Sequence, residues 1–249
     1  MQPLEASGAS TLRVRDLQKR YGRKLVVKGV SFEMRQAEVV GFLGPNGAGK
    51  TTVFYSIVGF IRPNAGEILI DDQVITGWPM YRRARLGISY LSQEPSVFRK
   101  LTVADNLWAV LEPRGDLSTA EKRQRQAYLL NELGIEAVAR QKAYTLSGGE
   151  RRRTEIARAL AIEPKFLLLD EPFAGIDPIA VHEIKSIIQT LSANGIGVLL
   201  TDHNVRDTLE ITHRSYIIKD GEIVVAGSRD EVMANELARK VYLGERFHI

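Results

Sequence analysis

The chain has 249 residues, of which 44% are hydrophobic and 26% charged, proportions that suit a globular protein with one α/β core and a smaller lobe. Cysteine is absent, which excludes disulfides, thiolate catalysis and thiolate metal sites and fits a reducing cytoplasm. The net charge of +4 is spread along the chain, and neither zinc-finger spacing nor an RNA-binding aromatic signature occurs, so we expect no nucleic-acid partner.

The apolar runs and the first residues indicate where the chain is located. No run approaches the roughly 18 to 20 apolar residues of a membrane helix, so we expect no direct membrane span. Residues 1–10 carry neither a basic leader nor an apolar centre, and we expect them to form a flexible tail. Residues 11–249 are then expected to form a single domain that stays in the cytoplasm.

The first third of the domain changes from alternating to continuous apolar patterning. Residues 12–14, 21–30 and 31–34 alternate apolar and polar side chains, which predicts half-buried antiparallel strands. Residues 38–43 form a short, nearly continuous apolar run, followed by a glycine-rich loop and a helix over about residues 50–59. The order strand, loop, helix is that of a phosphate-binding unit.

The glycine-rich loop fits the pattern G-x-x-x-x-G-K-[ST] at every fixed position. Its glycines let backbone N–H groups turn toward phosphates, Lys50 can reach the β and γ oxygens, and the Thr51 hydroxyl can hold Mg²⁺. The alternative is a glycine-rich turn without a ligand. The predicted nucleotide-binding residues are Gly44, Pro45, Asn46, Gly47, Ala48, Gly49, Lys50, Thr51 and Thr52.

The middle of the chain is predicted to be helical. After strands over residues 67–70 and 88–92, residues 94–163 carry helical spacing, which indicates a helical subdomain inserted in the α/β core. Ser118 to Glu121 is a capping-box pattern that opens a helix ended by Gly134.

The last third predicts a largely parallel sheet. Residues 165–169 and 197–201 are buried-strand runs separated by a helix over residues 180–191. Residues 215–219 and 222–225 flank the turn signal Asp220-Gly221, and a closing helix begins near Ser228.

Two carboxylates follow the first of these runs, at the edge where open α/β sheets bind ligands. Adjacent strand side chains point to opposite faces, so Asp170 and Glu171 cannot share one task. Asp170 is the better candidate for Mg²⁺ through water, and Glu171 for the general base that polarises the attacking water. The alternative for this pair is a cap of the following helix.

Ser147 to Glu150 is a second predicted phosphate-binding helix start. Its capping box presents the hydroxyl of Ser147 and the N–H groups of Gly148 and Gly149, where the helix dipole favours an anion by roughly 0.3 to 1 kcal/mol. A nucleotide has only one terminal phosphate, so one of the two starts must serve a nucleotide held by another copy or a partner. By itself the pattern is as consistent with a simple helix cap.

In their order and spacing, the phosphate loop, residues 146–150 and the Asp170-Glu171 strand resemble the ATP-binding cassette (ABC) ATPases over nearly the whole chain. Residue 150 is Glu where the commonest family form has Gln. The resemblance implies a P-loop NTPase fold, ATP and Mg²⁺ as ligands, and a homodimer in head-to-tail arrangement with ATP at the interface.

The resemblance also implies roles for four further residues. Tyr21 matches the aromatic residue that stacks on adenine, and Gln93 matches the glutamine that senses Mg²⁺ and the attacking water. Asp177 matches an aspartate at the dimer interface, and His203 matches the switch histidine that contacts the γ-phosphate. Each also has an ordinary structural reading: a core aromatic, a loop amide, a helix start and a structural histidine.

A closer resemblance, to the ATPases of lipopolysaccharide exporters in Gram-negative bacteria, rests on residues 146–161, 170–178, 201–206 and 241–247. In that family a cassette homodimer lies beneath two integral membrane permease subunits on the inner membrane. The resemblance implies that these subunits contact the segment Gln93–Leu107, with Phe98 and Arg99 as anchors. A core Phe98 beside a solvated Arg99 is the alternative.

Three other functions stay open from the sequence. A branched-chain amino-acid importer ATPase is also a short, free-standing cassette. A soluble cassette acting on DNA or ribosomes typically has long coiled coils or two cassettes in one chain, and neither is visible here. A non-hydrolytic regulatory cassette is disfavoured because Lys50, Asp170, Glu171 and His203 are all present.

Overall fold

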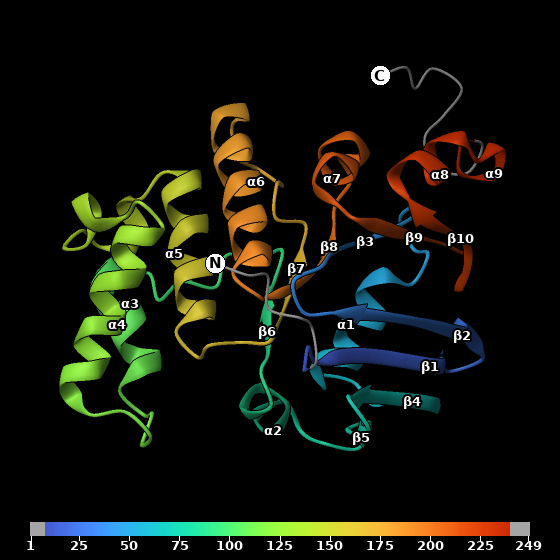
Figure 1. The fold of residues 1–249 in the computed structure, drawn as a ribbon, viewed down its shortest axis with the longest axis horizontal. Helices are drawn as coiled ribbons and strands as arrows, with labels where there is room; N and C mark the ends of the chain where they lie inside the picture. Colours follow the sequence, from blue (N-terminus) through green and yellow to red (C-terminus); the bar gives the residue numbers. More distant parts are fainter. Residues whose placement is uncertain (1–7, 240–249) are drawn as a thin grey trace.

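The computed structural model describes residues 8–239 of the chain, which form two sheets with helices around them (Figure 1). The four-stranded sheet has the order β2-β1-β4-β5 and the six-stranded sheet the order β10-β9-β3-β8-β7-β6. The strands are β1 (Thr11–Tyr21), β2 (Lys24–Arg35), β3 (Val39–Leu43), β4 (Ala65–Ile70), β5 (Gln73–Val74), β6 (Ile88–Leu91), β7 (Phe166–Asp170), β8 (Gly197–Thr201), β9 (Arg214–Lys219) and β10 (Glu222–Ser228).

Helices connect most of these strands. In the described residues the α-helices are α1 (Lys50–Val58), α2 (Met80–Arg85), α3 (Val103–Leu111), α4 (Thr119–Glu132), α5 (Gly148–Leu160), α6 (Pro178–Ala193), α7 (Val205–Ile211), α8 (Arg229–Ala234) and α9 (Glu236–Ala238). Two short 3-10 turns, Glu136–Val138 and Ala143–Thr145, lie between α4 and α5. No described helix is long and apolar enough to cross a membrane.

The smaller sheet is antiparallel throughout, as its alternating sequence predicts. The predicted division of its first strands is wrong, because the chain turns between Tyr21 and Lys24, which pair with each other. Gly22 adopts a positive φ of 56° at this turn, a conformation that glycine reaches without a steric penalty. The isolated glycine is the turn signal, and it interrupts the segment predicted as one strand over residues 21–30.

The larger sheet is mainly parallel, with β10 as its antiparallel edge. Strand β3 lies between β9 and β8, and β7 lies on the far side of β8. The carboxyl ends of these parallel strands therefore meet at one edge, where the phosphate loop, Asp170 and the loop after β8 come together.

Both faces of the six-stranded sheet are covered, which explains its continuous apolar runs. One face packs against α3 to α6, and the other packs against α1 and the antiparallel sheet. The strand residues on the first face are Val39, Leu91, Leu167, Leu169, Val198 and Leu200. Those on the second face, in the same strands, are Val40, Phe42, Ile88, Phe166, Leu168 and Leu199.

Helices α3, α4 and α5 gather beyond the β6 edge of the sheet, at the left of Figure 1. All three fall within the segment predicted to be helical, and the predicted capping box at Ser118 forms at the start of α4. Residues 94–102 are not helical. They form a loop of bends and turns between β6 and α3.

Predictions were made for segments at both ends of the chain. Ser10, placed in the predicted tail, is buried and its carbonyl accepts a hydrogen bond from the Gln36 backbone. Its hydroxyl accepts another from Lys165, so the prediction of a flexible tail is wrong at residue 10, while residues 1–7 of that tail lie outside the described residues. Residues 241–247, which contribute to the closer resemblance, lie outside the described residues.

Candidate nucleotide site

The phosphate loop runs from the buried end of β3 to the start of α1. A Cβ on Gly44 would come within 2.2 Å of the Ile218 carbonyl oxygen, so β9 leaves room only for glycine. Gly49 is the N-cap of α1 and has a φ of 109°, which turns the chain sharply into the helix. The loop thus presents an uncapped helix start, where unpaired N–H groups favour an anion.

Lys50 is folded over this loop. Its Nζ donates to the carbonyl oxygens of Gly44, at 2.6 Å, and Pro45, at 3.2 Å. Burial lowers the pKa of the Lys50 ammonium, while the charges of Glu171 and Asp170 act in the opposite direction. A buried cation at a helix start is well placed to receive phosphate oxygens.

Asp170 ends β7 and is nearly fully buried. Its Oδ2 accepts a hydrogen bond of 3.2 Å from the Tyr90 hydroxyl on β6. Burial raises the pKa of the Asp170 carboxyl, whereas the hydrogen bond from Tyr90 lowers it. The neighbouring strand therefore fixes the orientation of this carboxylate.

Glu171 is the point where the three predicted catalytic residues meet. Gln93 Nε2 donates to its Oε2 at 2.7 Å, and His203 Nε2 lies 2.7 Å from its Oε1. The residue has left the strand, because its φ is 48° while its N–H still donates to the Thr201 carbonyl. Glu171 lies beyond the end of β7, so its left-handed backbone, and not the predicted strand alternation, sets the direction of its side chain.

Asp202 braces the loop that carries His203. Its two carboxylate oxygens accept hydrogen bonds from the backbone N–H groups of Phe173, at 3.0 Å, and Asn204, at 2.9 Å. Burial raises the pKa of Asp202, and these two bonds lower it. The carboxylate thus connects the turn after Glu171 to the turn after His203.

A depression of about 170 Å³ lies over the phosphate loop. Its lining combines loop residues with the predicted base, and the predicted second phosphate site does not contribute to it. The lining residues are Val26, Asn46, Gly47, Gly49, Lys50, Thr51, Thr52 and Glu171.

The second predicted phosphate site is the start of α5. The Ser147 hydroxyl donates to Glu150 Oε2 at 2.7 Å and accepts from the Glu150 N–H at 3.3 Å, which forms the predicted capping box. A Cβ on Gly149 would come within 2.9 Å of the Ala180 Cβ, so this glycine lets α5 pack closely on α6. A Cβ on Gly148 would meet Ile176 at an ordinary 3.4 Å.

Asp177 and Tyr21 lie apart from this group of contacts. Asp177 is exposed and caps α6, since its Oδ1 accepts from the N–H groups of Ile179 and Ala180. Tyr21 ends β1 and is 49% exposed, and the Lys19 ammonium lies 5.2 Å from the centroid of its ring. An exposed ring can stack on a base, and the core-aromatic alternative for Tyr21 is wrong.

Three residues that brace the site were not predicted: Tyr90, Asp202 and Arg152. Each acts through a contact between segments far apart in the sequence, and only Asp202 had a local signal, a carboxylate before a strand-end histidine. Arg152 is buried, and its Nη2 donates to the backbone carbonyl of Asp170 at 3.2 Å.

Comparison with known proteins decides the family. Residues 27–174 match the family model described as ABC transporter. The chain belongs to the ABC transporter family.

The relatives of this ABC cassette cover nearly its whole length. It is 55% identical over 238 residues to the lipopolysaccharide export system ATP-binding protein LptB of Acidithiobacillus ferridurans, covering 96% of this chain and 98% of the relative. A crystal structure of the ADP conformation of an ATP-binding cassette of an ABC transporter is 28% identical with a TM-score of 0.84, over 95% of this chain and 99% of that one.

A second solved structure bears on assembly. It is described as the dimeric structure of a post-hydrolysis state of an ATP-binding cassette bound to ADP and Pi. It is 26% identical with a TM-score of 0.77, covering 88% of this ABC cassette and 98% of that chain.

The fold predicted from the sequence is therefore confirmed, and so is the membership of the family of ABC ATPases.

Proposed function

We propose that this chain is the ATP-hydrolysing subunit of an ABC transporter that exports lipopolysaccharide, working as a homodimer on the cytoplasmic face of the inner membrane. The main observation in favour of ATP hydrolysis is that the side chains of Gln93 and His203 both contact the Glu171 carboxylate beside the phosphate loop. The transported molecule is proposed from the 55% identity to a lipopolysaccharide export ATP-binding protein along nearly the full chain.

The residues divide the chemistry of hydrolysis between them. The loop N–H groups and Lys50 bind the β- and γ-phosphates, and Tyr21 stacks on the adenine. Glu171 accepts a proton from the attacking water, while Gln93 and His203 hold the carboxylate in place from two other segments. His203 is half exposed, so its ring can also reach the γ-phosphate.

The site fits Mg²⁺ bound mainly through water and phosphate. Within residues 8–239, no three or more acidic, histidine or cysteine side chains form a cluster suited to a metal. Mg²⁺ at a nucleotide site does not need such a cluster, because water and phosphate oxygens supply most of its ligands. Thr51 lines the depression, and Asp170 has a buried carboxylate that is oriented by a hydrogen bond from Tyr90. We assign Thr51, Gln93 and Asp170 to the ion, which when bound neutralises phosphate charge.

The homodimer is supported by the incompleteness of the site in one chain. The depression of about 170 Å³ is smaller than the roughly 300 to 1,000 Å³ of typical ligand sites, which favours a nucleotide that is covered in part by a second surface. Ser147, Gly148 and Gly149 supply that surface to the nucleotide of the other copy, with Asp177 at the interface. The solved dimer of a related cassette supports this arrangement.

The membrane subunits are proposed to bind the segment Gln93–Leu107. Phe98 is 51% exposed, which excludes the core-residue alternative, and the Arg158 guanidinium lies 5.1 Å from the centroid of its ring. Buried Asn106 hydrogen-bonds both the N–H and the carbonyl of Phe98, so the backbone under this exposed ring is held in place on both sides. Arg99 is exposed beside it and completes an anchor for a partner helix.

Purification of the tagged chain from detergent-solubilised membranes tests this function. We expect two integral membrane subunits to copurify, and lipopolysaccharide export to fail when the chain is depleted. A periplasmic amino-acid-binding protein as the functional partner would contradict the proposal. Phe98→Ala should weaken copurification while ATP binding is retained, and unchanged assembly of this variant would reject the proposed contact.

A further inference from the structure

Helix α7 follows directly on the turn that carries His203, and a buried lysine attaches this helix to α6. In Figure 1, α6 lies between α5 and α7. The Lys185 ammonium of α6 reaches α7, where it donates to Asp207 Oδ1 at 3.0 Å and to the Glu210 carboxylate. None of these three side chains has a place in the hydrolysis chemistry described above.

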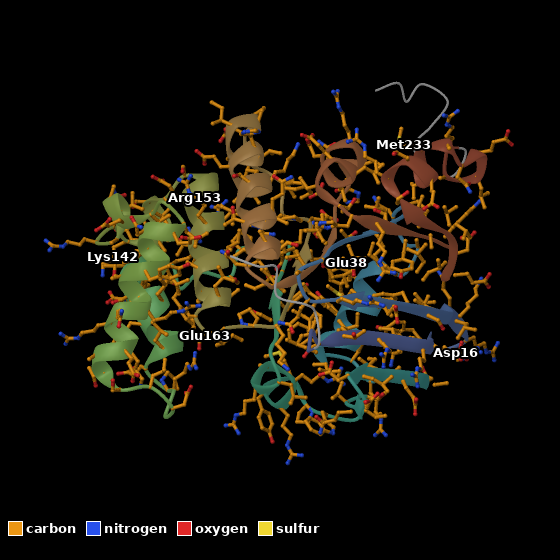
Figure 2. All side chains as sticks on the ribbon, in the orientation of Figure 1. Asp16, Glu38, Lys142, Arg153, Glu163 and Met233 are labelled. Atoms are coloured by element: carbon orange, nitrogen blue, oxygen red, sulfur yellow. The ribbon has the colours of Figure 1, made fainter. Side chains whose placement is uncertain are left out.

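Lys185 projects from a helix that is anchored in the core. It is 7% exposed, and its neighbours Ile184 and Ile188 belong to the apolar cluster on the six-stranded sheet. Two residues before the lysine, Glu183 pairs with Arg153 of α5, which is labelled in Figure 2. Helix α6 is therefore joined by ion pairs to the helices on both sides, and Lys185 makes the contact on the α7 side.

The lysine lies between two like charges. Asp207 and Glu210 are three residues apart, so they lie on one side of α7, where two carboxylates repel each other. Burial lowers the pKa of the Lys185 ammonium, but its hydrogen bonds to Glu210 and Asp207 raise this pKa above the ordinary value, so the ammonium stays charged. Removal of the lysine would leave both carboxylates without their counter-charge.

Asp207 also belongs to the cap of α7, next to His203. Its Oδ2 accepts a hydrogen bond from the Asn204 side-chain amide, and its N–H donates to Asn204 Oδ1 at 3.3 Å. The Asn204 N–H in turn donates to Asp202 Oδ1 at 2.9 Å. His203 lies between these two residues, with its Nε2 2.7 Å from Glu171 Oε1. The turn is therefore held on both sides of the histidine.

We propose that Lys185 is a positioning residue for His203. Through Asp207 and the Asn204 cap, it holds the turn after β8 so that the histidine stays against the Glu171 carboxylate. Lys185 acts at a distance, because the depression over the phosphate loop is lined by other residues. The inference rests on the proposed ATPase function, and it adds α6 to the elements that set the geometry of the catalytic residues.

The two carboxylates that share Lys185 give a paired test in the purified protein. Lys185→Met and Asp207→Ala should each lower kcat for ATP hydrolysis at least about tenfold, while the KM and Kd for ATP change less than about twofold, since positioning for catalysis is lost and binding is not. Glu210→Ala is the matched control, because it removes the other contact of the lysine and leaves the Asn204 cap intact. Its kcat should stay within about twofold of that of the unmodified chain. Equal losses in Asp207→Ala and Glu210→Ala would overturn the proposal.

Nitrogen NMR of the imidazole rings reports the position of His203 without turnover. The chain has four histidines, and the signal of His203 is the one that His203→Gln removes. In the ATP-free protein, we expect Lys185→Met and Asp207→Ala to shift this signal and Glu210→Ala to leave it unchanged. A lower kcat with an unchanged His203 signal would overturn the proposal, because the lysine would then act on another group.

A double-mutant cycle separates this route from a general structural role. If Lys185 acts through Asp207, Lys185→Met should lower kcat little further in the Asp207→Ala background. Equal factors in both backgrounds would overturn the proposal, as would a loss of ATP affinity in step with kcat. If Lys185→Met fails to fold, the comparison of Asp207→Ala with Glu210→Ala decides. No ATPase activity in the unmodified chain would instead refute the proposed function, and the His203 signal would still test the positioning.

Discussion

At the scale of single residues, the Glu171 carboxylate organises the candidate site. Its two oxygens face Gln93 and His203, which arrive from the loops after β6 and β8. A carboxylate held from both sides cannot rotate freely, so its basic oxygen is directed before substrate binds. The side chain is only 11% exposed, which keeps this oxygen out of bulk solvent.

Glu171→Gln should reduce ATP turnover by roughly 100-fold or more, because the amide keeps the size of the side chain and cannot accept the proton. ATP binding should be retained, and the dimer should persist with ATP because it is no longer consumed. Steady-state ATPase rates and size-exclusion chromatography with ATP measure both effects. Near-normal turnover would show that another group is the base.

At the scale of elements, much of the fold could be predicted because burial and capping leave local signals. The parallel strands read as continuous apolar runs since both faces are covered, and α4 and α5 carry capping boxes that form as predicted. Helix α2 had no such signal: its N-cap is Pro79, without a side-chain cap, and its sequence is rich in arginine. Helix α7 is short and begins at an Asn204 cap.

The candidate site was predictable only as far as its motifs extend. Lys50, Asp170 and Glu171 follow from loop and strand-end patterns. Tyr90 and Arg152 could not be found in this way, because each contacts Asp170 across a separation of 80 and 18 residues respectively. The Tyr90 contact depends on the order of strands in the sheet and the Arg152 contact on the packing of α5 against it, and no local pattern contains either.

The close approach of α5 to α6 gives a paired test with adjacent glycines. Gly149→Ala should destabilise the fold by about 1 to 3 kcal/mol, because its Cβ would lie 2.9 Å from the Ala180 Cβ. Gly148→Ala is the matched control and should be neutral or stabilising by up to about 1 kcal/mol, since alanine favours the helix and its contact is ordinary. Urea unfolding of both variants measures the difference, and equal stabilities would contradict the packing argument.

The α5 capping box predicts a pH dependence of stability. Hydrogen bonds from the side chain and N–H of Ser147 lower the pKa of Glu150 in the folded state. Glu150 therefore stabilises the fold at pH values above its ordinary pKa, and this contribution is lost as the pH falls through the lower folded-state value.

Glu150→Gln keeps the capping geometry and cannot titrate. At neutral pH we expect it to be less stable by roughly 0.3 to 1 kcal/mol, the usual contribution of a negative charge at a helix start. The difference should disappear at a pH below the folded-state pKa of Glu150. Thermal unfolding at the two pH values measures it, and a stability difference that is unchanged in acid would exclude this origin.

At the scale of the whole molecule, the two predicted phosphate sites belong to different layers. The loop before α1 packs with the antiparallel sheet, whereas the start of α5 packs with helices α3 to α6 on the other face of the six-stranded sheet. Only the first contributes to the depression beside Glu171. A head-to-tail homodimer gives both sites a nucleotide, and it makes each ATP depend on two chains.

Mixing two inactive variants measures this dependence directly. Lys50→Ala removes the loop lysine, and Ser147→Arg blocks the start of α5, so either variant alone should be inactive. An equimolar mixture should recover up to about a quarter of the unmodified ATPase rate, because random pairing makes half of the dimers mixed and each mixed dimer has one intact composite site. A mixture as inactive as its two parents would contradict the composite site.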